Sequence, residues 1–232
     1  MYSAHIDKET INKLPLDEFK GEVVIVNAIE HVPNAVDYLS RQTVVGVDTE
    51  SRPSFVRGVH YPTALVQIAT TQRCYLFQIN RIGMPEELAG FFANPEIMKI
   101  GLAFNDDLHG LQRQHEFTPQ NCHDIQKIVN DYGIFELGLQ KIYAIVFGRK
   151  ISKNQQLTNW DTATLTTEQA RYASTDAWAT LRIWLELRKA TPLSKRKVTQ
   201  MKAAEKEAMI RHQQETMAKK QAENDNHLSQ EK

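Results

Sequence analysis

The feature that most constrains this sequence is an almost uninterrupted run of β-branched residues, TVVGVD, at Thr43–Asp48. A strand that faces water on one side alternates apolar and polar residues, so a continuous apolar run predicts a strand buried on both faces. Such a strand lies in a sheet that is covered by helices on both sides. The chain has 232 residues, of which 41% are hydrophobic, and is long enough to build that layered core.

Further strand and helix patterns alternate along the chain. Strands are predicted at Glu22–Asn27, Thr63–Ala69, Arg73–Gln78 and Met98–Ala103. Only a short polar turn separates the second and third of these, which is typical of a hairpin. Helices are predicted at Pro33–Leu39, Pro85–Phe92, Asp106–Gln114, His123–Asp131, Leu139–Val146 and Thr167–Leu187. The expected fold class is α/β, with a central mixed β-sheet flanked by helices.

Composition predicts three parts: an N-terminal extension at residues 1–20, a main domain at 21–192, and a polar tail at 193–232. The tail contains no aromatic residue, no Gly and no Pro, and its nine Lys/Arg outnumber its six Asp/Glu. Its thin apolar stripe favours a solvated, fraying helix. A basic arm for nucleic acid or for a partner helix is the alternative. Beyond Ala222 the composition predicts disorder.

Charge and cysteine content exclude several classes of protein. Lys+Arg and Asp+Glu number 28 each, so no overall positive field attracts nucleic acid and any such binding must use local patches. No run of about 18 apolar residues exists, which excludes a membrane span. Cys74 and Cys122 form no C-x-x-C and no Cys/His cluster, which excludes a disulfide framework and a thiolate zinc site. The first twenty residues lack a secretory signal, so the expected compartment is the cytoplasm.

Acidic residues follow the buried strand directly, at Asp48-Thr49-Glu50. Because side chains alternate along a strand, Asp48 and Glu50 point to the same face, about 7 Å apart, and they repel each other unless a cation lies between them. A D-x-E sequence is common by itself. Taken alone, two solvated acids at a strand end are the simpler interpretation.

Two more polar groups have equally simple interpretations when taken singly. Asp106 and Asp107 open a predicted helix after an apolar strand, where one acid can cap the helix and the other is free to face the sheet. Tyr172 and Asp176 are spaced i, i+4, which places them on one face of a helix. A surface hydrogen bond between them would explain that pair.

The three groups together favour a metal site. If they converge, four carboxylates meet without a Lys or Arg and repel one another strongly. Divalent cations relieve that repulsion, and an oxygen-rich ligand set without cysteine suits Mg²⁺ or Mn²⁺ rather than zinc. Two such ions about 4 Å apart clamp the attacking and leaving oxygens of a phosphoryl displacement.

Three segments resemble the motifs of a known enzyme family. They are VGVDTESRPSF (Val45–Phe55), NDDLHGL (Asn105–Leu111) and LTTEQARYASTDAWATL (Leu165–Leu181). They are similar to the exonuclease motifs of the DEDD superfamily, tyrosine subclass, and in particular to ribonuclease D and Werner-syndrome exonuclease domains. The resemblance covers about residues 20–190. This chain departs from the S-x-W of the family, because Asn159 stands before Trp160 and the Ser is displaced.

This resemblance implies a ribonuclease-H-like (DnaQ-like) fold and 3′→5′ hydrolysis of nucleic acid that releases nucleoside 5′-monophosphates. It also implies two Mg²⁺ or Mn²⁺ ions per site. By resemblance, Asp48, Glu50 and Asp176 hold the ion that carries the attacking water. Asp48 also binds the second ion, with support from Asp107, and Tyr172 orients the water.

The resemblance also selects between the two adjacent acids. In the family, the acid is followed by Leu and by an apolar residue four positions further on, and Leu108 and Leu111 fit that frame if Asp107 is the ligand. Asp106 is then expected to cap the helix.

Outer contacts to the substrate are expected from local groups. Arg149, Lys150 and Lys153 form a basic patch that either grips phosphate or is a solvated loop. Phe55 and Phe104 either stack a terminal base or belong to the core. The expected partner is a nucleic acid with a single-stranded 3′ end. DNA or RNA preference and oligomeric state stay open.

Two alternative functions remain. One is an enzyme of the same fold restricted to RNA ends or short oligonucleotides. The other is a non-catalytic module that binds nucleic acid, against which the intact set of Asp48, Glu50, Asp107, Tyr172 and Asp176 argues.

Overall fold

The computed structural model describes residues 2–207, 210–211 and 217 of the chain. The chain divides into two compact units, Met1–Thr191 and Pro192–Lys232. Among the described residues, no helix is both long and apolar enough to cross a lipid bilayer.

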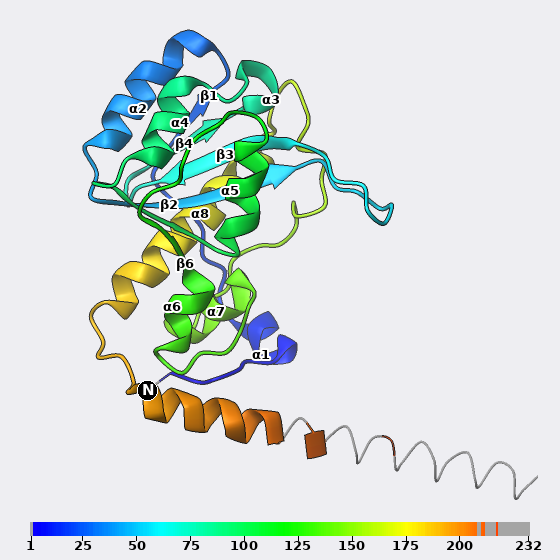
Figure 1. Cartoon of the computed structure of the whole chain (residues 1–232). Helices are drawn as coiled ribbons and strands as arrows, with labels where there is room; N and C mark the ends of the chain where they lie inside the picture. Colours follow the sequence, from blue (N-terminus) through cyan, green and yellow to red (C-terminus); the bar gives the residue numbers. More distant parts are fainter. Residues whose placement is uncertain (1, 208–209, 212–216, 218–232) are drawn as a thin grey trace, which may run out of the picture. The chain divides into compact units, whose positions relative to one another are not determined.

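The strands of the described residues form one mixed sheet in the spatial order β1-β4-β3-β2-β5-β6 (Figure 1). Their bounds are β1 (Glu22–Val26), β2 (Val44–Ser51), β3 (Thr63–Ala69), β4 (Arg73–Phe77), β5 (Met98–Gly101) and β6 (Cys122–Asp124). The pairs β2–β3 and β3–β4 are antiparallel, and the pairs β1–β4, β2–β5 and β5–β6 are parallel. The predicted mixed sheet and its β3–β4 hairpin are therefore confirmed.

Helices cover both faces of this sheet (Figure 1). Their bounds are α1 (Lys8–Lys13), η1 (Ile29–His31), α2 (Val32–Ser40), α3 (Ile79–Ile82), α4 (Glu86–Ala93), α5 (Phe104–Gln112), α6 (Ile125–Asn130), α7 (Leu139–Phe147) and α8 (Thr167–Leu187). Helix α8 crosses β2, β3 and β4 on one face, and α2, α4 and α5 contribute to the core on the other.

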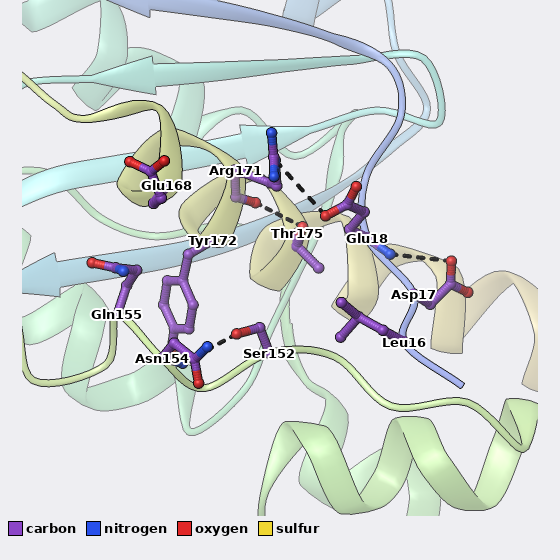
Figure 2. A pocket seen from close by; sticks show the side chains of 10 residues that line it. All are labelled: Leu16, Asp17, Glu18, Ser152, Asn154, Gln155, Glu168, Arg171, Tyr172 and Thr175. Carbon is purple, nitrogen blue, oxygen red and sulfur yellow. Dashed lines mark hydrogen bonds and ion pairs between the residues drawn. The ribbon is translucent and has the colours of Figure 1, made fainter. Parts of the chain in front are cut away.

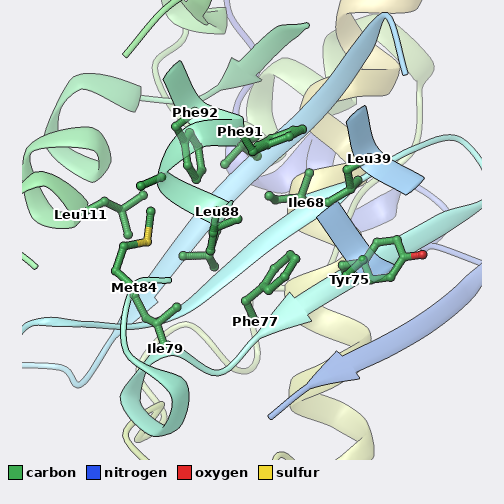
Figure 3. Packing of buried hydrophobic residues seen from close by; sticks show 14 of the residues in the cluster. Leu39, Ile68, Tyr75, Phe77, Ile79, Met84, Leu88, Phe91, Phe92 and Leu111 are labelled. Atoms are coloured by element: carbon green, nitrogen blue, oxygen red, sulfur yellow. The ribbon is translucent and has the colours of Figure 1, made fainter. Parts of the chain in front are cut away.

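Alternation of side chains along the strands gives each face of the sheet its own core. On one face, Val66 and Ile68 of β3 belong to a cluster with the helices α2 and α4. Figure 3 shows this cluster, with Ile68, Tyr75 and Phe77 from the strands beside Leu39, Leu88, Phe91 and Phe92 from the helices. On the other face, Leu65 and Ala69 pack with Ala173 of α8. Strand β3 is therefore buried on both sides.

Strand β2 approaches α8 most closely at Gly46. A Cβ atom added to Gly46 would lie 2.0 Å from the carbonyl oxygen of Ala177 and 2.9 Å from the Leu181 Cβ. No side chain fits there without a shift of backbone, so the glycine is what allows the strand and the helix to touch. The next residue of β2 on the same face is Asp48, and the contact therefore brings Asp48 beside the middle of α8.

One predicted helix was wrong at its start. We expected a helix over His123–Asp131, but Cys122–Asp124 form strand β6, which pairs in parallel with β5, and helix α6 begins only at Ile125. The Asp124 side chain accepts a hydrogen bond from the backbone N–H of Gln126 and so caps α6. Three residues are too few to show strand periodicity in a sequence, and their pairing with β5 depends on tertiary structure.

The predicted cap role of Asp106 was also wrong. Helix α5 begins at Phe104, two residues earlier than expected, and no side chain caps it. Ala103 precedes it with a φ of 52°, a left-handed conformation that turns the chain sharply after β5. Asp106 therefore lies inside the first turn of α5, where its charge is favourable toward the helix dipole without a capping hydrogen bond.

The N-terminal segment packs on the main domain. Leu16 forms a parallel bridge with Lys150, and the carboxylate of Asp17 accepts hydrogen bonds from the Tyr143 hydroxyl (2.8 Å) and the Arg182 guanidinium (2.7 Å). Residues predicted as an extension thus belong to the same compact unit as the sheet.

In the tail, residues 195–207 are helical and almost all exposed. This agrees with a solvated helix at the start of the tail. The predicted disorder beyond Ala222 lies outside the described residues.

Replacing Gly46 by Ala tests the β2–α8 contact. We expect Gly46→Ala to lower the free energy of unfolding by about 1–3 kcal/mol, because a new methyl group in a tight contact forces the backbone to shift. Gly90→Ala is the matched control, since Gly90 lies in α4 with open space around its Cβ position. It should stabilise the helix by about 0.5–1 kcal/mol. Urea unfolding of both variants measures the difference, and equal effects would contradict the packing argument.

Candidate active site

Three acidic side chains from β2 and α8 converge on one point. Asp48 and Glu50 lie on the face of β2 that meets α8, and Asp176 projects from α8 with 8% of its surface exposed. Carboxylate oxygens of the three residues lie within 4.8 Å of one another. The start of α8 is fixed by a capping box between Thr166 and Gln169, and this fixes the position of Asp176 along the helix.

Asp107 reaches this cluster from α5. Its carboxylate oxygen Oδ1 accepts a hydrogen bond from the Thr49 hydroxyl at 2.6 Å, and Thr49 lies between Asp48 and Glu50 in β2. Asp106 is exposed and lines a separate cavity. The structure therefore brings Asp107, and not Asp106, to the acidic cluster.

Burial and mutual repulsion raise the pKa values of these acids. Desolvation, followed by the charges of Glu50, Asp176 and Asp107, raises the pKa of Asp48 well above its usual range. Desolvation and the charges of Asp176 and Asp107 raise the pKa of Glu50 to about 9. These acids therefore tend to be protonated unless a cation lies among them and neutralises their charge.

The other two acids respond in the same direction. Desolvation raises the pKa of Asp176 to about 7, against the opposing effects of a Tyr172 hydrogen bond and of Lys153. Desolvation also raises the pKa of Asp107 to about 6, against the opposing hydrogen bond from Thr49. No ion pair to Lys or Arg within 4 Å involves any of the four acids in the described part of the chain.

Tyr172 borders the cluster as a hydrogen-bonding group. Its ring packs against Trp160 at a centroid distance of 5.9 Å, and only 8% of the residue is exposed. Desolvation, followed by the charges of Asp176 and Glu50, raises the pKa of the hydroxyl above its ordinary value. The hydroxyl therefore stays protonated at neutral pH and can donate a hydrogen bond.

A cavity of about 200 Å³ opens beside Tyr172 (Figure 2). Its walls come from the loop with Ser152, Asn154 and Gln155, from α8, and from the N-terminal segment, where Glu18 faces Arg171. Figure 2 shows the Tyr172 ring beside Asn154. Amide and hydroxyl groups thus line a space beside Tyr172, together with the carboxylates of Asp17, Glu18 and Glu168.

The predicted basic patch does not act as a unit. Arg149 forms an ion pair with Asp17 at 3.1 Å and donates to the Leu16 carbonyl, and Lys150 donates to the carbonyl of Asn12. These two side chains therefore bind the N-terminal segment. Lys153 is different, because its charge acts on Asp176 and lowers the pKa of that acid.

The two predicted stacking residues, Phe55 and Phe104, also differ in their exposure. Phe104 is 1% exposed and belongs to the core cluster with α2 and α4, so of its two expected roles the core role holds and base stacking does not. Phe104 follows strand β5 closely, and the turn at Ala103 directs its side chain into the core. Phe55 is 83% exposed and lies in the loop between β2 and β3.

Sequence reasoning missed two polar neighbours of the acids. Thr49 orients Asp107, as described above. Gln67 lies opposite Asp48 in the β2–β3 register, is fully buried, and has no hydrogen-bond partner for either amide atom in the described residues. The available signal was the single polar residue in the otherwise apolar strand TALVQIA.

The donor set fits divalent metal ions. It is composed of oxygen atoms only, it carries up to four negative charges, and it lacks a neutralising ion pair. Hard cations such as Mg²⁺ and Mn²⁺ prefer such ligands. The site can therefore hold metal, with Asp48, Glu50 and Asp176 as the ligands that already lie together.

Comparison with known proteins agrees with this geometry. Residues 23–192 match the model of a 3′-5′ exonuclease family. The bifunctional 3′-5′ exonuclease/ATP-dependent helicase WRN of Mus musculus is 26% identical over 190 residues, which cover 76% of this chain and 13% of that protein. The chain spans between 13% and 52% of the length of the first three curated relatives that it matches.

Solved structures share the fold. The Aedes aegypti Nibbler EXO domain aligns with a TM-score of 0.67 at 20% identity, over 80% of this chain and 99% of that one. Trypanosoma brucei RNase D in complex with RNA U12 aligns with a TM-score of 0.66 at 18% identity, over 82% of this chain and 68% of that one. The expected ribonuclease-H-like fold is thereby confirmed. Since the family match spans most of its sequence, this chain belongs to the 3′-5′ exonuclease family.

Proposed function

We propose that this chain hydrolyses the 3′-terminal phosphodiester bond of a single-stranded nucleic acid and releases a nucleoside 5′-monophosphate. The observation that carries the proposal is the convergence of Asp48, Glu50, Asp107 and Asp176 beside Tyr172. None of these four acids forms an ion pair with a Lys or Arg among the described residues. A binding module would have no need for four destabilising carboxylates in one place.

The proposed cofactors are two Mg²⁺ or Mn²⁺ ions. When bound, such ions neutralise charge on the phosphate and lower the pKa of the water that attacks it. Asp48, Glu50 and Asp176 are the proposed ligands of one ion, and Asp48 and Asp107 of the other. The Thr49 hydrogen bond to Oδ1 of Asp107 leaves Oδ2 of that carboxylate available as a ligand.

Tyr172 is the proposed group that orients the attacking water. Its hydroxyl stays protonated and lies next to Asp176, so it can donate to a water oxygen and fix the direction of attack. The cavity beside Tyr172 offers amide and hydroxyl groups that suit the sugar of the terminal nucleotide, and its acidic residues Asp17, Glu18 and Glu168 leave the phosphate to the metal ions. Lys153 supplies a nearby positive charge for the phosphate.

RNA is a candidate substrate because Trypanosoma brucei RNase D, which shares the fold, was solved with RNA. DNA is a second candidate because the WRN relative carries an exonuclease and a helicase. Digestion of matched DNA and RNA strands by the same preparation separates these two. Digestion of strands of different length shows whether the chain acts on short oligonucleotides only.

Asp106 and Asp107, which are adjacent in α5, allow a direct test of this function. A 5′-labelled single strand incubated with Mn²⁺ should shorten from its 3′ end as a ladder, and EDTA should abolish the ladder. Asp107→Asn should reduce the rate by at least the roughly 10–100-fold that follows loss of an outer partner at a metal site. Asp106→Asn, an equally conservative change on an exposed side chain, should leave the rate nearly unchanged. The reverse order would contradict the assignment of Asp107.

Tyr172→Phe tests the proposed role of the hydroxyl. We expect the single-turnover rate to fall by about 10²–10³, the loss that follows removal of one positioning hydrogen bond in a transition state. The ring remains against Trp160, so the thermal midpoint should stay within experimental error. A lower midpoint with an unchanged rate would assign the hydroxyl a structural role instead.

The raised pKa values predict how stability depends on pH without metal. The contribution of each acid to stability is complete below its unfolded pKa of about 4. It is lost as the pH rises through the folded pKa values of about 6 for Asp107, 7 for Asp176 and 9 for Glu50. The thermal midpoint in EDTA should therefore fall from acidic to alkaline pH, and Mn²⁺ should restore it most at the alkaline end.

The variant Asp48→Asn supplies the comparison for this pH series. It removes one of the repelling charges and should flatten the decline in EDTA. Asp37→Asn is the control, because Asp37 is an exposed partner of Arg41 on α2. If the wild type and Asp48→Asn decline with the same slope, the acids do not repel one another in the folded protein.

A further inference from the structure

The loop between β2 and β3, residues 52–62 and here called the β2–β3 loop, has an unusual surface. Its exposed side chains include Phe55 at 83%, Val56 at 66% and Tyr61 at 38%. Arg52 and Arg57 are exposed as well, neither forms an ion pair with a described residue, and the loop contains no acidic residue. Aromatic groups and unpaired positive charges are thus presented together to solvent.

The position of this loop ties it to the acidic cluster. It leaves β2 one residue after Glu50 and returns to β3 at Thr63, which pairs with Ser51. Figure 1 shows the loop extending away from the sheet beyond the ends of β2 and β3. A strand whose 3′ end is held at the acids therefore has this loop as a neighbour for its next nucleotides.

Helix α5 supplies a second wall. A cavity of about 700 Å³ lies between the loop residues His60, Tyr61 and Pro62 and the α5 side of the site, where His109 and Arg113 contribute. Asp106 is the one acidic residue in its lining. The cavity is open to solvent and its lining includes Arg113 and two histidines, so it can take a solvated phosphate backbone.

The chemistry of the loop fits single-stranded nucleic acid. Aromatic side chains stack on bases of any sequence, and arginine contributes both charge and stacking. Arg52 already lies over the Tyr61 ring, with 4.9 Å between its guanidinium carbon and the ring centroid, which holds both groups in place. Protein interfaces are also rich in aromatic residues and arginine, so what favours nucleic acid as the occupant is the position of the loop directly after Glu50 and Ser51, beside the acids that would hold a 3′ end.

We propose that the β2–β3 loop binds the single strand upstream of the 3′ end, with Phe55 stacking on a base and Arg57 contacting phosphate. This inference rests on the proposed function, since it places the loop along the strand that enters the acidic site. In this proposal the loop raises the affinity for long substrates and takes no part in hydrolysis.

The test combines one double variant with substrates of two lengths. The variant Phe55→Ala/Arg57→Ala is compared with Ile29→Ala/Arg41→Ala, which removes an exposed apolar residue and an exposed arginine elsewhere. Fluorescence anisotropy in EDTA measures the Kd for oligo-U and oligo-dT strands of about 16 nucleotides. Hydrolysis of a dinucleotide in Mn²⁺ measures the acidic site alone.

For the loop variant, we expect the Kd of the long strands to rise about 5- to 150-fold, from loss of one stacked base. The slope of log Kd against log salt should fall by about 0.7 through the loss of one phosphate contact. Dinucleotide hydrolysis should match the wild type, and the control variant should change neither value.

Three results would overturn the proposal. An unchanged Kd for long strands means that the loop does not bind them and leaves a protein partner as its use. An equal loss on the dinucleotide means that the loop supports the acidic site itself. A higher Kd with an unchanged salt slope means that Arg57 does not contact phosphate. In each case the wild type still degrades oligonucleotides, whereas failure of the proposed function would appear as no degradation by any form.

Discussion

The close packing of β2 on α8 is the contact on which the rest of the structure depends. Gly46 allows the strand to touch the backbone of Ala177, and this depth of approach brings Asp48 and Glu50 beside Asp176. A side chain at position 46 would separate the two elements by about the size of a methyl group. The acids would then lie further apart and in contact with more water, where neither their repulsion nor their affinity for metal would be as strong.

The acidic cluster works against folding unless a cation is present. Burial and like charge raise the pKa values of its members, so the protein loses stability when all four are ionised. Thr49 and Tyr172 hydrogen-bond to members of the cluster but carry no charge that could neutralise it. A bound cation would remove the same penalty, so the proposed metal binding and the predicted loss of stability without metal follow from one arrangement.

Charged residues outside the cluster have separate tasks. Arg149 and Lys150, which follow α7 in a basic run, hold the N-terminal segment through Asp17 and two backbone carbonyls. Their position orders the loop that leads to Lys153 and to the cavity beside Tyr172. Among the described residues near the site, the arginines without an ion pair include Arg52 and Arg57 of the β2–β3 loop and Arg113 at the end of α5, which border the proposed path of the strand.

The sequence alone determined five of the six described strands, most of the helices and the acidic residues, because periodicity and strand-end position are local properties of a chain. It could not determine that Phe104 is buried, that Arg149 binds Asp17, or that Cys122–Asp124 form a strand. Each of these depends on a partner distant in sequence, and patterns of single residues carry no information about such partners. Both the sequence and the tertiary structure bear on the choice between Asp106 and Asp107. Motif spacing in the sequence favoured Asp107, but only the structure gives the physical reason, through the turn at Ala103 and the hydrogen bond from Thr49.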